Sequence, residues 1–509
     1  MAAPDPPRSA VPPLPTPAPE VSPRLSNEDL TPARERTWGT YSVFALWMAD
    51  THAISNYTFA AGLFVLGLAA WQVFLALLVG ITIVHLGMNL MGHAGHRTGV
   101  PFPVLARVSF GVYGANIPAL IRAIIAIAWY GIQTWLASVA LVVLTVQLVP
   151  ATAAYTENDL LGLSTLGWAA FLFMWALQLV LLTRGMEAIR RVQDWVTGPV
   201  VWAVMLFLAG WLIVRADFDI PLTSGATDLT IGEQWRHGLA AVGLTVATFL
   251  TLILNYADFS RFTDSHRSYR RGNLLGLPVN FTAFALVSVL TTAGTVAVFG
   301  ETITEPVEIV ARIDNPWVTV VGAVTFVVST VGINVVANFV SPAYDLANVA
   351  PRYLNFRRGG VISAVLAVVV LPWHLYANPA VINYFLGGLA AFLAPLVAIL
   401  LVDYHLVRRG RIDLASLYRT DPGGAYHYRH GVNPVALQAF LPAALVSGVL
   451  ALVPMFAAVA PFSWVFGLVL AGTVYYLRSP REAAGPLPRA AIPVPPELGG
   501  AQPDVPPER

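Results

Sequence analysis

The chain has 509 residues, of which 56% are hydrophobic and only 11% are charged, whereas a soluble globular protein carries roughly 25% charged residues. The formal net charge of +1 argues against a nucleic-acid partner, and the absence of cysteine excludes disulfides, thiolate catalysis and cysteine metal sites. Because apolar runs of ~20 residues recur along the chain, the sequence predicts an all-α polytopic membrane protein.

The two ends of the chain differ from its apolar middle. Residues 1–36 are rich in Pro and Ala and contain no apolar run, and residues 479–509 are again rich in Pro. We therefore expect two disordered tails around a transmembrane domain over residues 37–478. The first apolar run begins only near Trp38, so no signal peptide is visible.

Twelve membrane spans are predicted between the tails. They cover approximately residues 38–66, 71–91, 115–149, 164–183, 195–214, 235–257, 273–299, 317–340, 360–377, 380–402, 432–454 and 458–477.

The distribution of arginine orients these spans. All 29 basic residues are Arg, and most of them fall in the tails or in loops on one side of the predicted membrane. Only Arg215, Arg236 and Arg312 fall on the other side, and Arg122 lies near the inner end of the third span. This asymmetry fits the positive-inside rule. We therefore expect a protein of the plasma (inner) membrane with both termini in the cytoplasm.

Three spans contain clusters of polar residues at mid-membrane depth. The first carries Asp50 and His52, the sixth carries three threonines and Asn255, and the eighth reads Gly332-Ile-Asn334-Val-Val-Ala-Asn338. Interrupted helices at matching places in two halves are typical of transporters built from repeats. We predict two five-span repeats, over about residues 37–215 and 233–403, and two extra helices over about 432–477.

The third span holds an unusual pair, Trp129 and Gln133, which lie on the same side of a helix because they are four residues apart. The pair suits a flat polar ligand, although a helix–helix hydrogen bond beside a packing tryptophan explains it as well. Combining the polar and aromatic residues at mid-depth gives a candidate binding set. The set is Asp50, His52, Trp129, Gln133, Thr248, Phe249, Asn334 and Asn338.

This set favours a neutral planar heterocycle. Trp129 and Phe249 can enclose a ring by offset stacking, and Gln133 and Asn338 each offer a carbonyl acceptor and an amide donor. Such a pair matches an amide or ureide edge better than a carboxylate or a sugar.

No pattern in the chain indicates an enzyme, a cofactor or a metal. His93 and His96 lie in a Gly-rich stretch with no third ligand nearby, and no nucleophile–base pair or phosphate-binding loop stands out. Asp258 and Asp345, at the inner ends of spans and close to Arg261 and Arg352, are interpreted as ion pairs or gate elements.

Several short motifs occur in one order between about residues 26 and 430. They are Asn27-Glu-Asp-Leu30, Gly92-His-Ala-Gly95, Pro101-Phe-Pro103, Gly114-Ala-Asn-Ile-Pro118, Gln133-Thr-Trp135, Leu252-Ile-Leu-Asn255 with Asp258-Phe, Asp314-Asn-Pro316, Asn338 with Ser341-Pro-Ala-Tyr-Asp345, and Asp403-Tyr404. By these motifs the chain resembles the nucleobase–cation symporter-1 family, which includes permeases for cytosine, uracil, purines, allantoin and hydantoins. The allantoin-permease branch is nearest.

The resemblance implies a LeuT-like five-plus-five inverted repeat with broken helices 1 and 6, and transport by alternating access. It also implies that a ring is held between Trp129 and Phe249 and hydrogen-bonded by Gln133 and Asn338.

The chain departs from the family pattern at two places. Ala53 stands where some members have an amide, so one substrate hydrogen bond is either absent or supplied by His52. Gly332 and Ile333 stand where sodium-coupled members have Ser and Thr hydroxyls. We therefore favour a proton over sodium as the coupling cation, with Asp50 or His52 as its carrier, and Asn334 as a further coupling or gating candidate.

The predicted function is import of a neutral nucleobase or hydantoin-like ring by cation symport. An amino-acid permease of the same fold and a membrane sensor that does not transport remain as alternatives. The expected partners are the small heterocycle and the lipid bilayer, whereas the choice of ring and the oligomeric state stay open.

Overall fold

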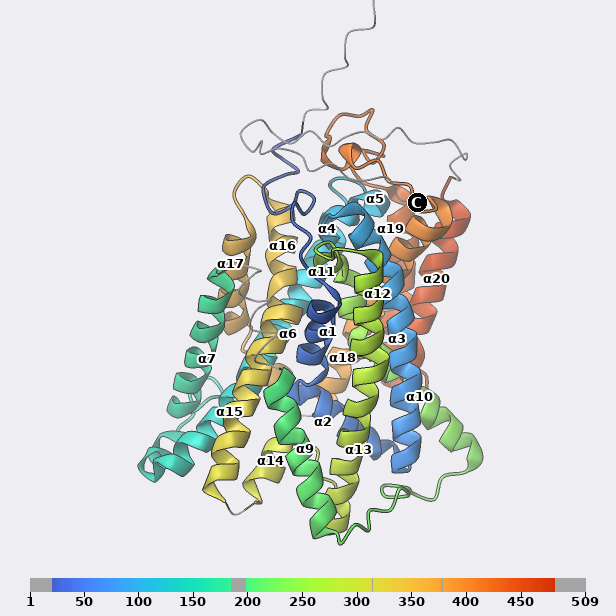
Figure 1. Cartoon of the computed structure of the whole chain (residues 1–509). Helices are drawn as coiled ribbons and strands as arrows, with labels where there is room; N and C mark the ends of the chain where they lie inside the picture. The colour runs from blue at the N-terminus through green and yellow to red at the C-terminus, as the bar shows by residue number, and fades with distance from the viewer. Residues whose placement is uncertain (1–20, 185–197, 314, 377–378, 481–509) are drawn as a thin grey trace, which may run out of the picture.

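The computed structural model describes residues 21–184, 198–313, 315–376 and 379–480 of the chain. Nearly all of the regular structure is helical, and most of the long helices run roughly parallel to one another (Figure 1). In chain order the α-helices are α1 (Thr40–Thr51), α2 (Ile54–Gly62), α3 (Ala70–Thr98), α4 (Phe102–Leu105), α5 (Arg107–Phe110), α6 (Asn116–Leu148), α7 (Thr165–Thr183), α9 (Gly198–Arg215), α10 (Ile231–Asn255), α11 (Ala257–Ser260), α12 (His266–Leu274), α13 (Asn280–Phe299), α14 (Pro306–Ala311), α15 (Pro316–Ile333), α16 (Val340–Val349), α17 (Phe356–Val369), α18 (Pro379–Leu401), α19 (Pro434–Leu452) and α20 (Ser463–Arg478).

Each of the twelve predicted spans contains at least one helix, but fewer of them meet a simple length criterion. Among the described residues, seven helices are long and apolar enough to cross a membrane, or eight if the bent pair α15–α16 counts as one span. The first span is divided into the short helices α1 and α2, and α7 and α9 contain shorter apolar helices. A length criterion therefore finds fewer spans than the sequence predicts, because a span that is divided into short helices does not satisfy it.

The predicted break in the first span lies between Thr51 and Ile54. The amide nitrogen of Asn56 in α2 donates to the backbone oxygens of Asp50 (2.8 Å) and Thr51 (3.1 Å) at the end of α1. A buried helix end needs partners for its terminal carbonyl groups, and here a side chain of the next half-helix supplies them.

The predicted break in the sixth span lies at Tyr256, directly after Asn255 and beyond Thr248 and Phe249. Helix α10 is continuous from Ile231 to Asn255, and the chain turns only at Tyr256 before α11. The hydroxyls of Thr245 and Thr248 donate to carbonyls one turn earlier, at 2.8 and 3.0 Å. Because these polar side chains are satisfied within a regular helix, they do not require an interruption.

The eighth span is interrupted where the sequence places its asparagines. A π-helix, η5 (Asn334–Phe339), separates α15 from α16, and the two flanking helices are bent by 43°. A π-helical turn inside an α-helix frequently marks a functional position.

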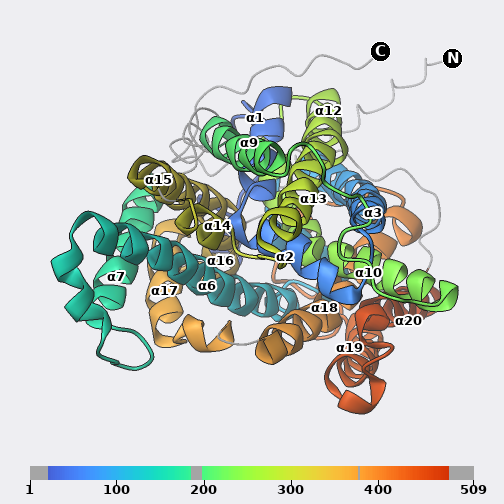
Figure 2. The same ribbon diagram turned by 90° about the horizontal axis from the view of Figure 1, so that it is seen from below.

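Close packing holds the helices around this region. Helix α3 lies along α10, and α18, α19 and α20 pack against one another on one side of the bundle (Figure 2). Helix α6 crosses the interior and contacts α7, α15, α16 and α17. The two extra helices predicted at the C-terminal end are α19 and α20.

The expectation of disorder over residues 1–36 is wrong from residue 21 onward. We call residues 21–36 the strap, and the end of the molecule where it lies, at the top of Figure 1, the strap end. Leu25 and Leu30 of the strap are buried, the amide nitrogen of Asn27 donates to the backbone oxygen of Leu354 at 2.8 Å, and Tyr418 donates to that of Leu30 at 2.8 Å. The strap is therefore ordered by two buried leucines and by hydrogen bonds to distant parts of the chain. Residues 1–20 and 481–509, where the rest of the tails was predicted, lie outside the described residues.

Candidate functional site

A cavity of about 50 Å³ lies where α1, α2, α6, α10 and η5 meet. Its walls bring together most of the candidate binding set. The lining residues are Asp50, Ser55, Asn56, Trp129, Gln133, Thr248, Phe249, Thr251, Leu252, Ala337 and Asn338. These residues come from segments up to 288 positions apart in the chain (from 50 to 338), so the cavity is a product of the fold.

Gln133 is held in one orientation. Its amide nitrogen donates to the hydroxyl of Ser55 at 2.7 Å. Its carbonyl oxygen is buried and accepts no hydrogen bond from any described residue. A buried acceptor without a donor costs about 1–3 kcal/mol, and a ligand N–H group in the cavity removes that cost.

Asn338 is oriented in the same manner by a buried network. Its amide nitrogen donates to Asn334 Oδ1 at 2.9 Å, one turn earlier in η5. The amide nitrogen of Asn334 in turn lies 2.8 Å from Gln178 Oε1 and 2.9 Å from the backbone oxygen of Tyr130. Asn334 is fully buried and, through the hydrogen bond that its Oδ1 accepts, positions Asn338 at the cavity.

Asp50 lies at the end of α1, and its side chain lines the cavity. The residue is 4% exposed, and among the described residues no cation and no hydrogen-bond donor pairs with its carboxyl group. A buried carboxylate without a partner is costly. The group is therefore suited either to accept hydrogen bonds from a ligand or to bind a proton.

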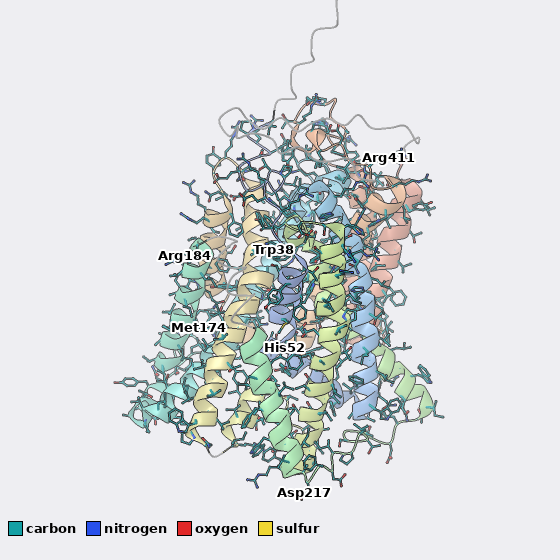
Figure 3. All side chains as sticks on the ribbon, viewed as in Figure 1. Trp38, His52, Met174, Arg184, Asp217 and Arg411 are labelled. Carbon is teal, nitrogen blue, oxygen red and sulfur yellow. The ribbon has the colours of Figure 1, made fainter. Side chains whose placement is uncertain are left out.

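His52 does not line the cavity, contrary to the prediction. Its Nδ1 lies 3.0 Å from the Tyr57 hydroxyl, its Nε2 lies 3.3 Å from Asn280 Oδ1, and its ring packs against Trp202. Figure 3 places His52 near mid-height, between Trp38 toward the strap end and Asp217 at the far end. The turn between α1 and α2 directs the imidazole toward α9 and α13, so it is not placed to replace the amide missing at Ala53.

The remaining predicted positions do not line the cavity. Ala53 is fully buried as the residue that precedes α2, and Gly332 is buried in α15, where it offers no side-chain oxygen. The side chain of Ile333 lies outside the described residues. His93 and His96 lie in α3, where His96 Nδ1 contacts the Thr263 hydroxyl at 2.8 Å. No group of three metal-binding side chains is found among the described residues.

The two aromatic walls are provided by α6 and α10. The Trp129 ring lies 6.4 Å from the ring of Tyr376, and the Phe249 ring packs edge-on against Phe281 at 5.8 Å. Both aromatic side chains therefore have neighbours that hold them at the cavity.

Sequence reasoning missed Ser55, Asn56, Thr251, Leu252 and Ala337 as lining residues. A signal existed for Ser55 and Asn56, because both lie in the polar stretch that breaks the first span. Their partners, Gln133 and the end of α1, could not be assigned from one sequence.

A layer of buried polar groups closes the cavity toward the strap end. Arg122 Nη2 donates to the backbone oxygen of Ala337 at 2.8 Å, and Asp258 Oδ1 accepts from the backbone N–H of Phe102 at 2.7 Å. Arg261, the predicted partner of Asp258, instead donates to the backbone oxygens of Asp29 and Thr31 in the strap.

Comparisons with known proteins agree with this architecture. Residues 31–477 match the family model "Permease for cytosine/purines, uracil, thiamine, allantoin". An allantoin permease of Bacillus subtilis is 38% identical over 460 residues, which cover 90% of this chain and 93% of the relative. A hydantoin permease of Microbacterium maritypicum is 29% identical over 447 residues, covering 83% of this chain and 84% of the relative.

Among solved structures, the chain is similar to Mhp1, a nucleobase-cation-symport-1 family transporter in a closed conformation with bromovinylhydantoin bound. The TM-score is 0.73 at 26% identity, and the match covers 89% of this chain and 95% of the other. The fold is thus LeuT-like, as the motifs implied.

Proposed function

Because the chain belongs to the nucleobase–cation symporter-1 family of permeases, we propose that it imports a neutral hydantoin-like ring, of the allantoin class, together with a proton. It is a membrane transporter and not an enzyme. The observation that carries the proposal is the cavity itself, where two aromatic walls face polar groups that include the unpaired carbonyl oxygen of Gln133.

The acceptors favour a ligand rich in N–H groups. Gln133 and Asn338 have each committed one amide hydrogen to a protein partner, and the buried carbonyl oxygen of Gln133 accepts no hydrogen bond from a described residue. Asp50 adds a carboxyl group. Hydantoin and allantoin carry N–H groups beside carbonyls, and relatives named allantoin permease and hydantoin permease support this class.

The same geometry disfavours an amino acid. A zwitterion brings a carboxylate, which would meet Asp50 and two amide oxygens, and no arginine lines the cavity. Placing like charges together in a low-dielectric site is costly.

Proton coupling is supported by Asp50 and by Gly332. Sodium needs several oxygen ligands, but Gly332 provides no side-chain oxygen where the family resemblance implies a hydroxyl ligand. Asp50 therefore takes the role that the sequence left open between Asp50 and His52.

The strap end is the cytoplasmic side in this proposal. The arginine-rich loops and both tails would then lie inside, as the positive-inside rule requires, and the loop that contains Asp217 would lie outside.

Uptake by intact cells tests the proposal. Cells that express the protein receive labelled allantoin, hydantoin, uracil, cytosine or hypoxanthine, each with and without a protonophore. We expect accumulation of allantoin or hydantoin that the protonophore abolishes. Accumulation of an amino acid and of none of the rings would contradict the proposal. Ligand binding without accumulation would indicate a sensor.

A further inference from the structure

A second cavity of about 40 Å³ lies directly beside the central one. Trp129, Thr248 and Thr251 line both cavities, so the two meet at these side chains. We call the second cavity the side chamber. Its other walls come from α2, α10, α18 and α20, with Phe59, Ala247 and Trp464 among the lining residues.

The wall formed by α20 is firmly placed. A short 3₁₀ turn, η10 (Ala460–Phe462), packs against α10 at Gly243, where an added Cβ would lie 2.9 Å from the Pro461 oxygen and 3.4 Å from Trp464 Nε1. The Ser447 hydroxyl of α19 donates to the backbone oxygen of Ser463 at 2.7 Å. The start of α20 is thereby fixed between α10 and α19, and it presents the Trp464 indole to the chamber.

Trp464 carries an unused hydrogen-bond donor. Its Nε1 is buried and finds no acceptor among the residues that the structure describes. Buried tryptophan N–H groups usually have a partner, and a buried polar group without one is unfavourable. An unpaired donor at the wall of a cavity indicates an acceptor that arrives with a ligand.

We propose that the side chamber is a subsite for a substituent on the transported ring, and that Trp464 Nε1 donates a hydrogen bond to an acceptor atom on that substituent. The inference rests on the proposed function and deepens it. With the ring between Trp129 and Phe249, a short substituent passes Thr248 and enters the chamber. A water-sized group needs at least 10–15 Å³ of such space, so the chamber holds roughly three to four groups of that size.

A ureido group has the required chemistry. It has four heavy atoms, one of which is a carbonyl oxygen, and it is the substituent that distinguishes allantoin from unsubstituted hydantoin. The chamber therefore determines which ring of the hydantoin class is preferred, whereas the central cavity recognises the ring that all of them share.

The test compares three rings in one competition assay with the full-length protein in cells. Uptake of labelled allantoin is competed by unlabelled allantoin, hydantoin and 5-propylhydantoin, whose substituent has a similar size but no acceptor. The variants are Trp464→Phe, which removes the N–H group and keeps an aromatic ring, and Ala247→Leu, which fills the chamber. Trp317→Phe, at an exposed position on α15, is the matched control.

For Trp464→Phe we expect the affinity for allantoin to fall roughly three- to tenfold relative to that for hydantoin, with no such change for 5-propylhydantoin. For Ala247→Leu we expect both substituted rings to lose affinity relative to hydantoin. In the Trp317→Phe control, we expect the affinities for the three rings to keep the ratios of the wild type. Unchanged ratios in both chamber variants would overturn the subsite while leaving the proposed function intact. A wild-type protein that takes up neither allantoin nor hydantoin would overturn the proposed function itself.

Discussion

At the scale of single residues, the proposed site depends on two amides that the protein itself orients. Gln133 and Asn338 could each present a donor or an acceptor, but Ser55 and Asn334 take up one hydrogen of each amide. A preorganised acceptor favours a ligand N–H group without the cost of rotating the amide on binding.

Removal of either amide tests this arrangement. We expect Gln133→Ala and Asn338→Ala each to lower ring affinity about ten- to hundredfold, because a hydrogen bond in a buried site is lost (about 1–3 kcal/mol). Uptake of labelled allantoin or hydantoin, normalised to the amount of protein in the membrane, is the measurement. Gln72→Ala provides the control, because Gln72 bonds to Gln234 in a groove on the outside of α3 and α10. Normal uptake in both site variants would refute the assignment.

Asn334 should behave differently, since it positions Asn338 and does not itself line the cavity. We expect Asn334→Ala to lower the melting temperature of the purified protein as well as its ring affinity, because Gln178 Oε1 and the Tyr130 carbonyl lose a common donor. Asn338→Ala should lower affinity with a smaller change in melting temperature. An Asn334→Ala variant as stable as the wild type would contradict the supporting role.

Much of the residue-level picture was accessible from the sequence. The four-residue spacing of Trp129 and Gln133 places both on one side of α6, and both line the cavity with Phe249 and Asn338. The direction of His52 was not accessible, because the turn after Thr51 rotates the chain in a way that helical spacing does not describe. The Ser55–Gln133 bond was equally hidden, since it joins two spans.

At the scale of elements, the site depends on where helices are interrupted and where they are not. The end of α1 and the π-helix η5 deliver Asp50 and Asn338, while the unbroken α10 presents Thr248 and Phe249 from a regular surface. The sequence located the first and eighth interruptions by their polar clusters. The sixth interruption follows Asn255, the last member of its cluster, whereas Thr245 and Thr248 bond to carbonyl groups of their own helix.

Close contact between α3 and the segment after α10 requires glycine at position 95. An added Cβ there would contact the Ser260 hydroxyl and lie 2.6 Å from Ala257 Cα, which is backbone and cannot move aside. We expect Gly95→Leu to abolish the folded protein, as judged by size-exclusion chromatography in detergent. Gly210→Ala in α9 should be neutral, because nothing lies within 4 Å of its Cβ. A monodisperse Gly95→Leu protein would contradict this packing.

At the scale of the whole molecule, a polar contact that we call the latch joins the loop before α14 to the broken first span. Glu305, just before α14, accepts a hydrogen bond from the Thr58 hydroxyl of α2 at 3.0 Å. Burial raises the pKa of Glu305; the Thr58 hydrogen bond opposes the shift and Glu308 adds to it. The carboxyl group is therefore more easily protonated in this position than it would be in water.

A raised pKa gives the latch a defined pH dependence. The contact between Glu305 and Thr58 is favoured at low pH, and this stabilisation is lost as the pH rises from the ordinary glutamate range through the raised pKa. We expect a cysteine introduced as Ala247→Cys to become more accessible to an impermeant thiol reagent over that interval. The protein has no native cysteine, so the signal has no background. Adding Glu305→Gln should remove the pH dependence and keep the cysteine protected. Equal pH dependence with and without Glu305 would exclude it as the latch.

Composition and the arginine pattern sufficed to predict a polytopic helical fold, and the ordered motifs sufficed to predict its family. The order of the strap could not be predicted, because the anchors of Asn27 and Leu30 lie more than 300 residues away along the chain. Composition describes a segment by itself and contains no information about such partners.

The most direct test of the account is accumulation by purified protein in proteoliposomes under an imposed inward proton gradient, for the wild type and for Asp50→Asn. For one proton per ring, the wild type should concentrate labelled allantoin or hydantoin about tenfold per pH unit. Asp50→Asn should still exchange ring for ring across the membrane without concentrating it. Concentrative, proton-driven uptake by Asp50→Asn would contradict the account, as would a wild type that responds to sodium and not to protons.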